Sequence, residues 1–331
     1  MNSFGRLFRL SIFGESHGET VGVTLDGVPA GMDLDEESFG KDLGRRKSGM
    51  RGTTPRKESD RPHIVSGLFD GRTTGAPLTI LFRNENTLSG DYRNLVTHPR
   101  PSHSDWVAMQ KFHGFNDYRG GGHFSGRLTL ALVAAGVVAK KVLGKKVKIQ
   151  SRLVEIDHCN NPDDFPQIVE QALRSLDSVG GIVECTATGI PVGLGEPFFD
   201  SAESVLSHLL FSIPAVKGVE FGAGFEAARM RGSEHNDPIV SPDGRTATNN
   251  AGGIVGGITN GNPVVVRVAV KPTSSIASPQ VTLNTETGQP EELRIKGRHD
   301  ACIALRAPVV VEAAVAVGLC DLLLVSRGQR A

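Results

Sequence analysis

The sequence predicts an α+β fold in which helices pack on antiparallel or mixed sheets. The segment 125–143 reads as a buried helix because apolar residues occupy nearly all its faces, and the chain ends in a second apolar helix. Segments such as 20–25 and 263–270 are β-branched and bounded by glycine or proline, which is typical of strands. No linker divides the chain, so we expect a single domain over residues 1–331.

Charge and composition exclude several partners. The chain has 36 Lys+Arg and 36 Asp+Glu, and this zero net charge argues against bulk nucleic acid or a charged membrane surface. The 40 glycines predict many tight turns and close backbone approaches. No run reaches the roughly 18 uninterrupted apolar residues of a membrane span, since charged residues and a proline interrupt 301–325. We therefore expect neither a nucleic acid nor a membrane partner.

The cysteines and the N-terminus predict a cytoplasmic protein. The four cysteines stand singly with no C-x-x-C pair, so we expect no metal site and no redox pair. Buried free thiols in a cytosolic protein are the simpler interpretation. Arg6 and Arg9 interrupt the only early apolar run, so a signal peptide is not expected.

The most informative motif is the turn at 14–18, which reads GESHG and follows an apolar strand. Polar groups between two glycines are poor core material, and strand ends often present catalytic groups. The motif also satisfies the nucleophile-elbow pattern of serine hydrolases, but an elbow needs a helix after the serine. Because 20–25 predicts a strand instead, His17 rather than Ser16 becomes the principal candidate.

A short helix is predicted over 35–47, with Asp35 as its cap and basic residues in its last turn. The segment 45–63 that follows is rich in Arg, Lys, Gly and Thr and predicts a loop. A solvated surface loop is the usual interpretation of such a charge run. An anion-binding loop is the alternative, and the acid-poor half over 45–57 favours it.

Short strands are expected over 64–82, and a polar cluster, RPSHSD, follows at 100–105. Ser104 or Asp105 can cap a helix over 106–112. His103 would then precede a helix N-terminus, a place that lowers the pKa of an imidazole.

A glycine loop, YRGGGHFS at 118–125, precedes the buried helix of 125–143. Such a loop is a generic phosphate cradle, because free N–H groups and the helix dipole both favour anions. It lacks the Walker lysine spacing, and no G-x-G-x-x-G pattern occurs in the chain.

The second half alternates predicted strands and helices, with long irregular stretches between them. The strands are expected over 147–156, 181–188, 218–221 and 263–270, and the helices over 163–176 and 201–211. Loops of this length are usually functional.

Residues able to do chemistry gather at four turns: His17, His103, Ser125 with Arg127, and Arg298 with Asp300. Two histidines and an aspartate can supply acid–base chemistry. The arginines, together with Arg46 and Arg51, can bind several anionic groups. A small substrate with phosphate and carboxylate groups, or a phosphorylated cofactor, fits this set.

The sequence resembles the chorismate synthase family over essentially its whole length. The matching segments are 13–18 (FGESHG), 45–46 (RR), 100–105 (RPSHSD), 117–122 (DYRGGG), 125–129 (SGRLT), 251–257 (AGGIVGG), 271–275 (KPTSS) and 297–300 (GRHD). Several are weak singly, but in this order and spacing they are highly specific.

The resemblance implies the last step of the shikimate pathway. In that step, 5-enolpyruvylshikimate 3-phosphate loses phosphate and a C6 hydrogen by anti-1,4-elimination to give chorismate. The family uses reduced FMN without net redox change, the flavin being thought to donate an electron transiently. The resemblance also implies a β-α-β sandwich and a homotetramer. We expect the reduced FMN to come from an external flavin reductant.

The resemblance carries catalytic roles over by position. His17 would assist departure of the substrate phosphate, and His103 would protonate or stabilise the reduced flavin. Asp300 would help manage the proton at flavin N5. Ser16 and Ser125 would take part in these proton networks.

Binding roles carry over in the same way. Arg46 and Arg51 match nucleotide (NADP) positions of the family, but we expect them, with Arg127, to bind substrate anions. The positions that match flavin-binding residues are His123, Phe124, Ser125, Pro214, Ala215, Gly256, Lys271, Pro272, Thr273, Ser274, Ser275 and Arg298. Many family members have Arg-Ser where this chain has His123 and Phe124, which removes a fixed charge and makes pH-sensitive affinity an expectation.

Two rival functions have distinct signatures. A serine hydrolase using Ser16 would be labelled by a fluorophosphonate. A non-enzymatic module that binds phosphoanions or nucleic acid through 45–61 would show affinity that falls steeply with salt. In that case, His103→Ala would cause no catalytic loss.

Overall fold

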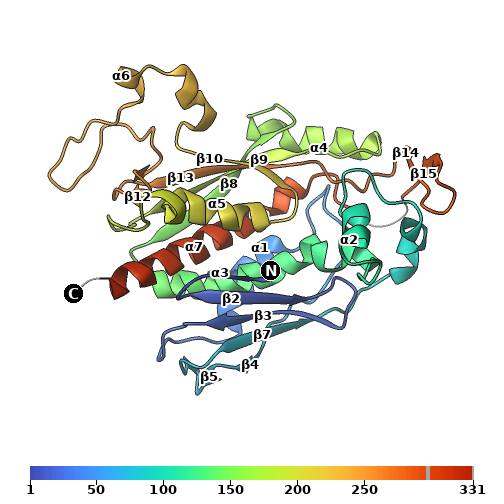
Figure 1. Cartoon of the computed structure of the whole chain (residues 1–331), viewed down its shortest axis with the longest axis horizontal. Coiled ribbons are helices and arrows are strands. Elements are labelled where there is room, and N and C mark those ends of the chain that lie inside the picture. The colour runs from blue at the N-terminus through green and yellow to red at the C-terminus, as the bar shows by residue number, and fades with distance from the viewer. Residues whose placement is uncertain (296–298, 330–331) are drawn as a thin grey trace.

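The computed structural model describes residues 1–295 and 299–329. Two antiparallel sheets lie on either side of a layer of helices (Figure 1). The first sheet has the order β1-β2-β3-β7-β4 and the second the order β10-β13-β9-β8. Helices packed on antiparallel sheets agree with the predicted α+β class.

The bounds of the strands are as follows. The first sheet contains β1 (Ser3–Phe4), β2 (Arg9–Gly14), β3 (Thr20–Asp26), β4 (His63–Ser66) and β7 (Leu78–Arg83). The second contains β8 (Lys148–Ile156), β9 (Gly181–Thr188), β10 (Val216–Phe221) and β13 (Val264–Val270). Three ribbons pair β5 (Leu68–Phe69) with β6 (Arg72–Thr73), β11 (Ile254–Val255) with β12 (Ile258–Thr259), and β14 (Gln280–Leu283) with β15 (Pro290–Leu293).

The helices connect and cover these sheets. The α-helices are α1 (Gly40–Arg46), α2 (Asp105–Lys111), α3 (Thr129–Leu143), α4 (Phe165–Arg174), α5 (Ala202–Ser212), α6 (Gly232–His235) and α7 (Pro308–Gly328). Shorter 3-10 turns are η1 (Glu37–Phe39), η2 (Ser89–Val96), η3 (Arg119–Phe124), η4 (Gly126–Leu128), η5 (Pro162–Asp164), η6 (Phe198–Asp200), η7 (Gly224–Arg229) and η8 (Ile303–Arg306).

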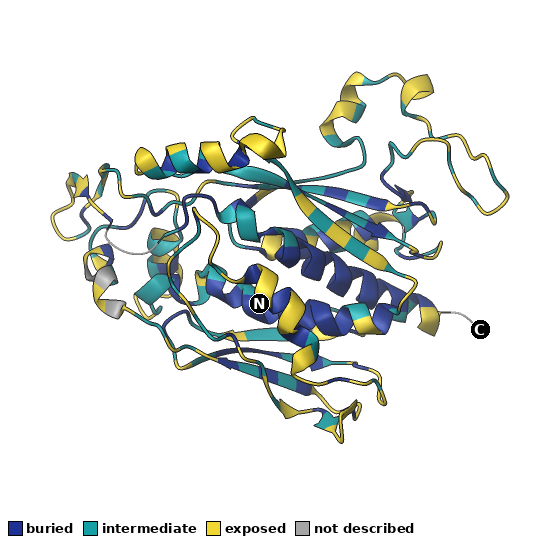
Figure 2. Ribbon diagram, turned by 180° about the vertical axis from the view of Figure 1, so that it is seen from behind, coloured by how far each residue is buried: buried dark blue, intermediate teal, exposed yellow. Residues whose placement is uncertain are grey.

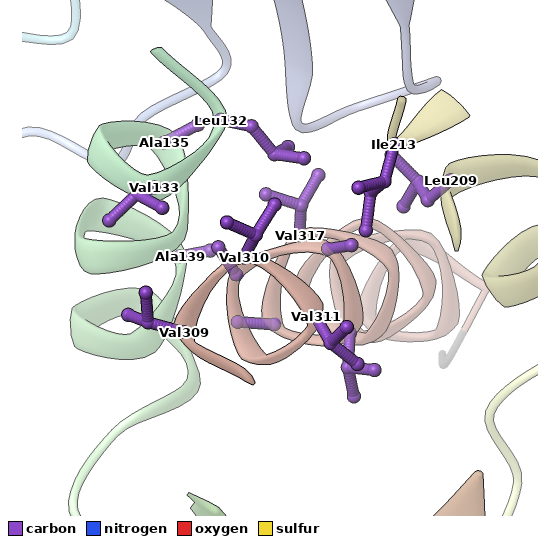
Figure 3. Close-up of a cluster of buried hydrophobic side chains, with 14 of the residues drawn as sticks. Leu132, Val133, Ala135, Ala139, Leu209, Ile213, Val309, Val310, Val311 and Val317 are labelled. Carbon is purple, nitrogen blue, oxygen red and sulfur yellow. The ribbon is translucent and has the colours of Figure 1, made fainter. Parts of the chain in front are cut away.

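Helices α3 and α7 form the centre of the core. Helix α3 packs on β3 and α7 on β8 and β9, so each sheet has one of the two against its inner face. The helices approach closely at Gly136, where an added Cβ would lie 2.4 Å from the Cβ of Ala313. Figure 2 shows both helices buried along most of their length. Apolar side chains from α3, α5 and α7 meet in the cluster of Figure 3.

Helix α7 is long and apolar enough to cross a membrane by length and composition alone, but 78% of its most apolar window is buried inside the protein. Its composition is therefore explained by its central place in the core.

The other buried helix, α3, begins at Thr129 rather than 125, because Ser125 caps the turn η4 by accepting a hydrogen bond from the backbone N–H of Arg127.

Strand β3 follows the GESHG turn, as predicted. It confirms the argument against a nucleophile elbow, because no helix follows Ser16. The loop predicted after α1 is also present, since no helix or strand lies between Arg46 and His63. The end of β2 and the GESHG turn after it contact the 3-10 turn η3, which contains the three glycines 120–122.

Candidate active site

A cavity of about 890 Å³ opens between the GESHG turn, the loop after α1, the glycine loop and the ends of α3 and α5. This volume lies in the range of small-molecule and cofactor sites. Most of the residues singled out from the sequence line it. They are Ser16, Arg46, His103, His123, Phe124, Ser125, Arg127, Pro214, Ala215, Lys271, Pro272, Thr273, Ser274, Ser275 and Asp300.

Four other predicted residues are placed differently. His17 is buried and does not line the cavity, but it packs against the cavity-lining Gly120, where an added Cβ would lie 2.6 Å from its Nε2. Arg51 does not line the cavity; its side chain is 75% exposed and pairs with Glu170 of α4. Gly256 lies in the exposed turn between β11 and β12, outside the cavity lining. Arg298 lies outside the described residues.

The GESHG turn is held to its surroundings through its backbone carbonyls. Arg56 donates from Nη2 to the carbonyl of Ser16 at 3.0 Å and from Nη1 to its hydroxyl at 3.0 Å. The Nδ1 of His123 lies 2.7 Å from the carbonyl of Gly14. Asn84 donates to two further carbonyls of the turn. Neither Arg56 nor Asn84 was singled out from the sequence, although Arg56 lies in the basic loop.

These contacts determine what Ser16 and His123 can do. The hydroxyl of Ser16 accepts a hydrogen bond from a guanidinium, which cannot act as a general base for a serine nucleophile. A carbonyl only accepts, so Nδ1 of His123 carries the proton and donates to Gly14. In the neutral form of a histidine with Nδ1 protonated, Nε2 is an acceptor, where an arginine would only donate.

The glycine loop approaches the turn closely because three successive glycines adopt positive φ. Gly120, Gly121 and Gly122 have φ of 61°, 82° and 54°. A Cβ on Gly122 would lie 2.0 Å from the carbonyl oxygen of Asp117. The carbonyl of Gly122 also accepts from the N–H of Ser16 at 3.1 Å. Only glycine allows this approach, which sets the ring of His17 against the loop.

His103 belongs to a hydrogen-bonded cluster with Asp105 and Arg100 at the start of α2. Its Nδ1 donates to Asp105 at 2.7 Å, and Asp105 also accepts from Nε and Nη2 of Arg100 at 2.7 Å each. Burial lowers the pKa of His103, and nearby Arg100 adds to this shift while the bond to Asp105 opposes it. The ring is therefore neutral at pH 7. The lowered pKa agrees with the sequence prediction, but its main cause is burial.

Asp105→Asn is expected to move the acid limb of the kcat/KM profile to lower pH. The carboxylate stabilises the protonated ring of His103, so its removal lowers the pKa of His103 further. The pH dependence of kcat/KM measures this shift. Asp26→Asn, which removes a carboxylate paired with Arg9, serves as the control and leaves the limb in place. A limb that moved to higher pH would contradict the assignment.

Two arginines meet on one buried carboxylate. Arg46 donates from Nη2 to Asp60 at 3.1 Å, and Arg127 donates from Nη1 to the other oxygen of Asp60. Burial lowers the pKa of Arg46 to about 10. Burial opposes the ionisation of Asp60, but Arg46 and Arg127 outweigh it and hold its pKa below the usual range. The group carries one net positive charge.

Arg46 keeps one unused donor. Its Nε is buried and has no hydrogen-bond partner among residues 1–295 and 299–329. A buried N–H without an acceptor is costly, so a ligand acceptor at this position would be bound favourably. Arg46 lines the cavity, so its guanidinium supplies positive charge that favours an anionic group bound there.

Asp300 is engaged with a third arginine. It accepts from Nε and Nη2 of Arg306 at 3.0 and 2.7 Å, and from the N–H of Thr54 at 3.0 Å. Arg306 also lines the cavity. Asp300 thereby joins the loop after α1 to the end of η8.

The KPTSS segment lies beside the His103 cluster. Lys271 donates to the hydroxyl of Ser274 at 2.7 Å, and burial lowers the pKa of Lys271. Ser275 accepts from Nη1 of Arg100 at 2.9 Å. The N–H of Lys271 donates to the carbonyl of Ala215 at 2.9 Å, which brings Pro214 and Ala215 to the same wall.

Among the described residues, no group of three or more His, Cys, Asp or Glu side chains could hold a metal ion. The described cysteines are all free, and burial raises the pKa of Cys302 to about 11.

Comparison with known proteins identifies relatives across almost the whole chain. The family model described as chorismate synthase matches residues 8–324. A chorismate synthase of Chitinophaga pinensis is 61% identical over 327 residues, covering 99% of this chain and 98% of that protein. One of Korarchaeum cryptofilum is 47% identical over 346 residues, covering 96% of each. A crystal structure of a chorismate synthase superposes with a TM-score of 0.75 at 30% identity, covering 97% of this chain and 93% of that one.

Proposed function

The chain belongs to the chorismate synthase family, and we propose that its cavity binds 5-enolpyruvylshikimate 3-phosphate beside reduced FMN. The enzyme is a lyase of the shikimate pathway that forms chorismate by eliminating phosphate and a C6 hydrogen. The observation that carries the proposed site is the buried, unpartnered Nε of Arg46 in a cavity that also holds Arg127 and Arg306.

Arg46 and Arg127 bind the anionic groups of the substrate in this proposal. Both are buried, so water screens their charges weakly, and they share one counter-charge in Asp60. Arginine suits this task because its planar fork matches phosphate and carboxylate oxygens. Arg51, which pairs with Glu170 outside the cavity, is not part of this site.

The cavity lining contains both apolar and polar residues that suit a flavin. Leu132, Leu209 and Ile213 line it and can pack against an aromatic ring system (Figure 3). The KPTSS segment and Pro214–Ala215 supply hydroxyl, ammonium and backbone groups. When bound, the reduced flavin supplies transient electron transfer, so that the elimination has no net redox change.

The two histidines take part in separate proton transfers in this proposal. His17, which packs against Gly120, assists departure of the substrate phosphate, and Ser16 supports it. His103, neutral and oriented by Asp105, presents its other ring nitrogen toward Gly121 and the flavin-binding wall. Asp300, held by Arg306, takes part in proton handling near the flavin, and Ser125 fixes the turn that carries Arg127.

We further propose a single β-α-β sandwich domain that assembles as a homotetramer in the cytoplasm. One continuous apolar cluster joins both sheets to the helices between them, which supports one domain.

Residues 224–251 project beyond the sheets in both views (Figures 1 and 2) and expose Phe225, Ile239 and Val240, which favours burial against another copy. In this proposal, a separate reductant supplies the reduced FMN.

Anaerobic turnover with chemically reduced FMN tests the proposal. Purified protein is expected to release phosphate from 5-enolpyruvylshikimate 3-phosphate and to form chorismate, read by its absorbance. Oxidised FMN without reductant is the control and supports no turnover. No phosphate release with reduced FMN would reject the proposed substrate and cofactor.

A further inference from the structure

We propose that Asn84 is a positioning residue that couples Arg127 to the turn carrying His17. Asn84 follows directly after β7, and its backbone N–H donates to the carbonyl of Glu19 at 3.0 Å. This bond fixes the start of the side chain beside the turn. The proposal rests on the roles proposed above for His17 and Arg127.

The side-chain amide of Asn84 uses its donors and its acceptor. Nδ2 donates to the carbonyl of Glu15 at 3.1 Å and to that of Gly18 at 2.7 Å. Oδ1 accepts from Nε of Arg127 at 2.9 Å. This assignment of the amide is the one its partners require, because carbonyls only accept and a guanidinium only donates.

The two carbonyls lie on either side of Ser16 and His17, so one amide closes the turn at both ends. Arg56 and His123 each hold a single carbonyl of the same turn, at Ser16 and Gly14. Asn84 differs from them because its third bond goes to an arginine proposed to bind substrate.

The turn has little room to move without displacing His17. The ring packs edge-on against Tyr92, with centroids 5.2 Å apart, and lies against Gly120. Misplacement of a catalytic group by about 1 Å can lower a rate about 10²-fold. Loss of the amide would therefore reduce the rate through His17 more than it reduces substrate binding, because Arg127 keeps its bond to Asp60.

Asn84→Ala tests this inference in two backgrounds. In the wild-type background, kcat is expected to fall by about 10²-fold, with KM for the substrate changing far less. In the His17→Ala background, the same change is expected to have little further effect, because residues that act through one another are not additive. Asn84→Asp keeps the volume and the acceptor for Arg127 while removing both donors, and it is used if the alanine variant does not fold.

Asn86→Asp is the matched control. It introduces the same negative charge as Asn84→Asp, two residues further along the chain. The side chain of Asn86 donates to the carbonyl of Lys57 and does not line the cavity. Its kcat is expected to stay within about twofold of wild type, as for surface substitutions.

The inference is overturned if Asn84→Ala and Asn84→Asp keep wild-type kcat. It is also overturned if they raise KM alone or lower kcat equally in both backgrounds. If His17→Ala itself keeps the wild-type rate, the proposed role of His17 fails first. The inference on Asn84 fails separately when His17→Ala is inactive but the Asn84 variants are not.

Discussion

His17→Ala is expected to lower kcat by about 10²–10⁴-fold, the usual contribution of a positioned general acid or base. The ring is buried and packs against Tyr92 and against Gly120 of the glycine loop. A departing phosphate gains charge as the C–O bond breaks, and a nearby imidazole can neutralise that charge with a proton. Anaerobic phosphate release with chemically reduced FMN measures the loss.

KM should change little in this variant, because the interaction with His17 grows mainly in the transition state. His113→Ala is the matched control, since His113 is exposed and does not line the cavity. It should leave kcat near the wild-type value. A His17→Ala enzyme within a few-fold of the wild-type rate would refute the assigned role while leaving the family membership intact.

Local signals in the sequence were enough to predict the elements that carry the site. Strand β3 was predictable from a β-branched run, and this strand removed the nucleophile-elbow interpretation of Ser16. The buried character of α3 followed from apolar residues on all its faces. The positive φ of Gly120 and its neighbours agrees with a glycine loop that approaches another backbone closely.

Partners that meet through tertiary contacts were not predictable. Asn84 and Gly18 are 66 residues apart, and Arg127 and Asp60 are 67 apart. Arg46 and Arg51 give the same signal in one basic segment, yet the last turn of α1 aims Arg46 at the cavity. Arg51 instead pairs with Glu170 on the distant helix α4. Which arginine serves the site depends on how the loop packs, and charge patterning carries no such information.

Asp60→Ala is expected to destabilise the folded protein by about 3–5 kcal/mol, as when one partner of a buried ion pair is removed. Asp60 is 4% exposed and lies between Arg46 and Arg127, so the variant leaves two buried guanidiniums without the carboxylate that they share. Urea unfolding at pH 7 measures the difference. Asp33→Ala, which removes an exposed carboxylate paired with Arg72, should change the free energy of unfolding by less than about 1 kcal/mol.

The pH dependence of stability gives a second measurement of the same carboxylate. The pKa of Asp60 is lower in the folded protein than in the unfolded chain, so its stabilisation is present above the unfolded pKa. It is lost as the pH falls through the folded pKa, and the variant should lack this part of the acid-induced loss. An unfolding free energy near that of wild type at pH 7 would show that the two guanidiniums do not need Asp60.

Inorganic phosphate should partly reverse the destabilisation of Asp60→Ala. An anion that binds only the folded state stabilises it by mass action, and in this variant it would also supply the missing counter-charge. The unpartnered Nε of Arg46 gives such an anion a donor that no described residue satisfies. The midpoint of thermal unfolding should therefore rise more with added phosphate in Asp60→Ala than in wild type or in Asp33→Ala. An equal rise in all three proteins would mean that phosphate does not bind between Arg46 and Arg127.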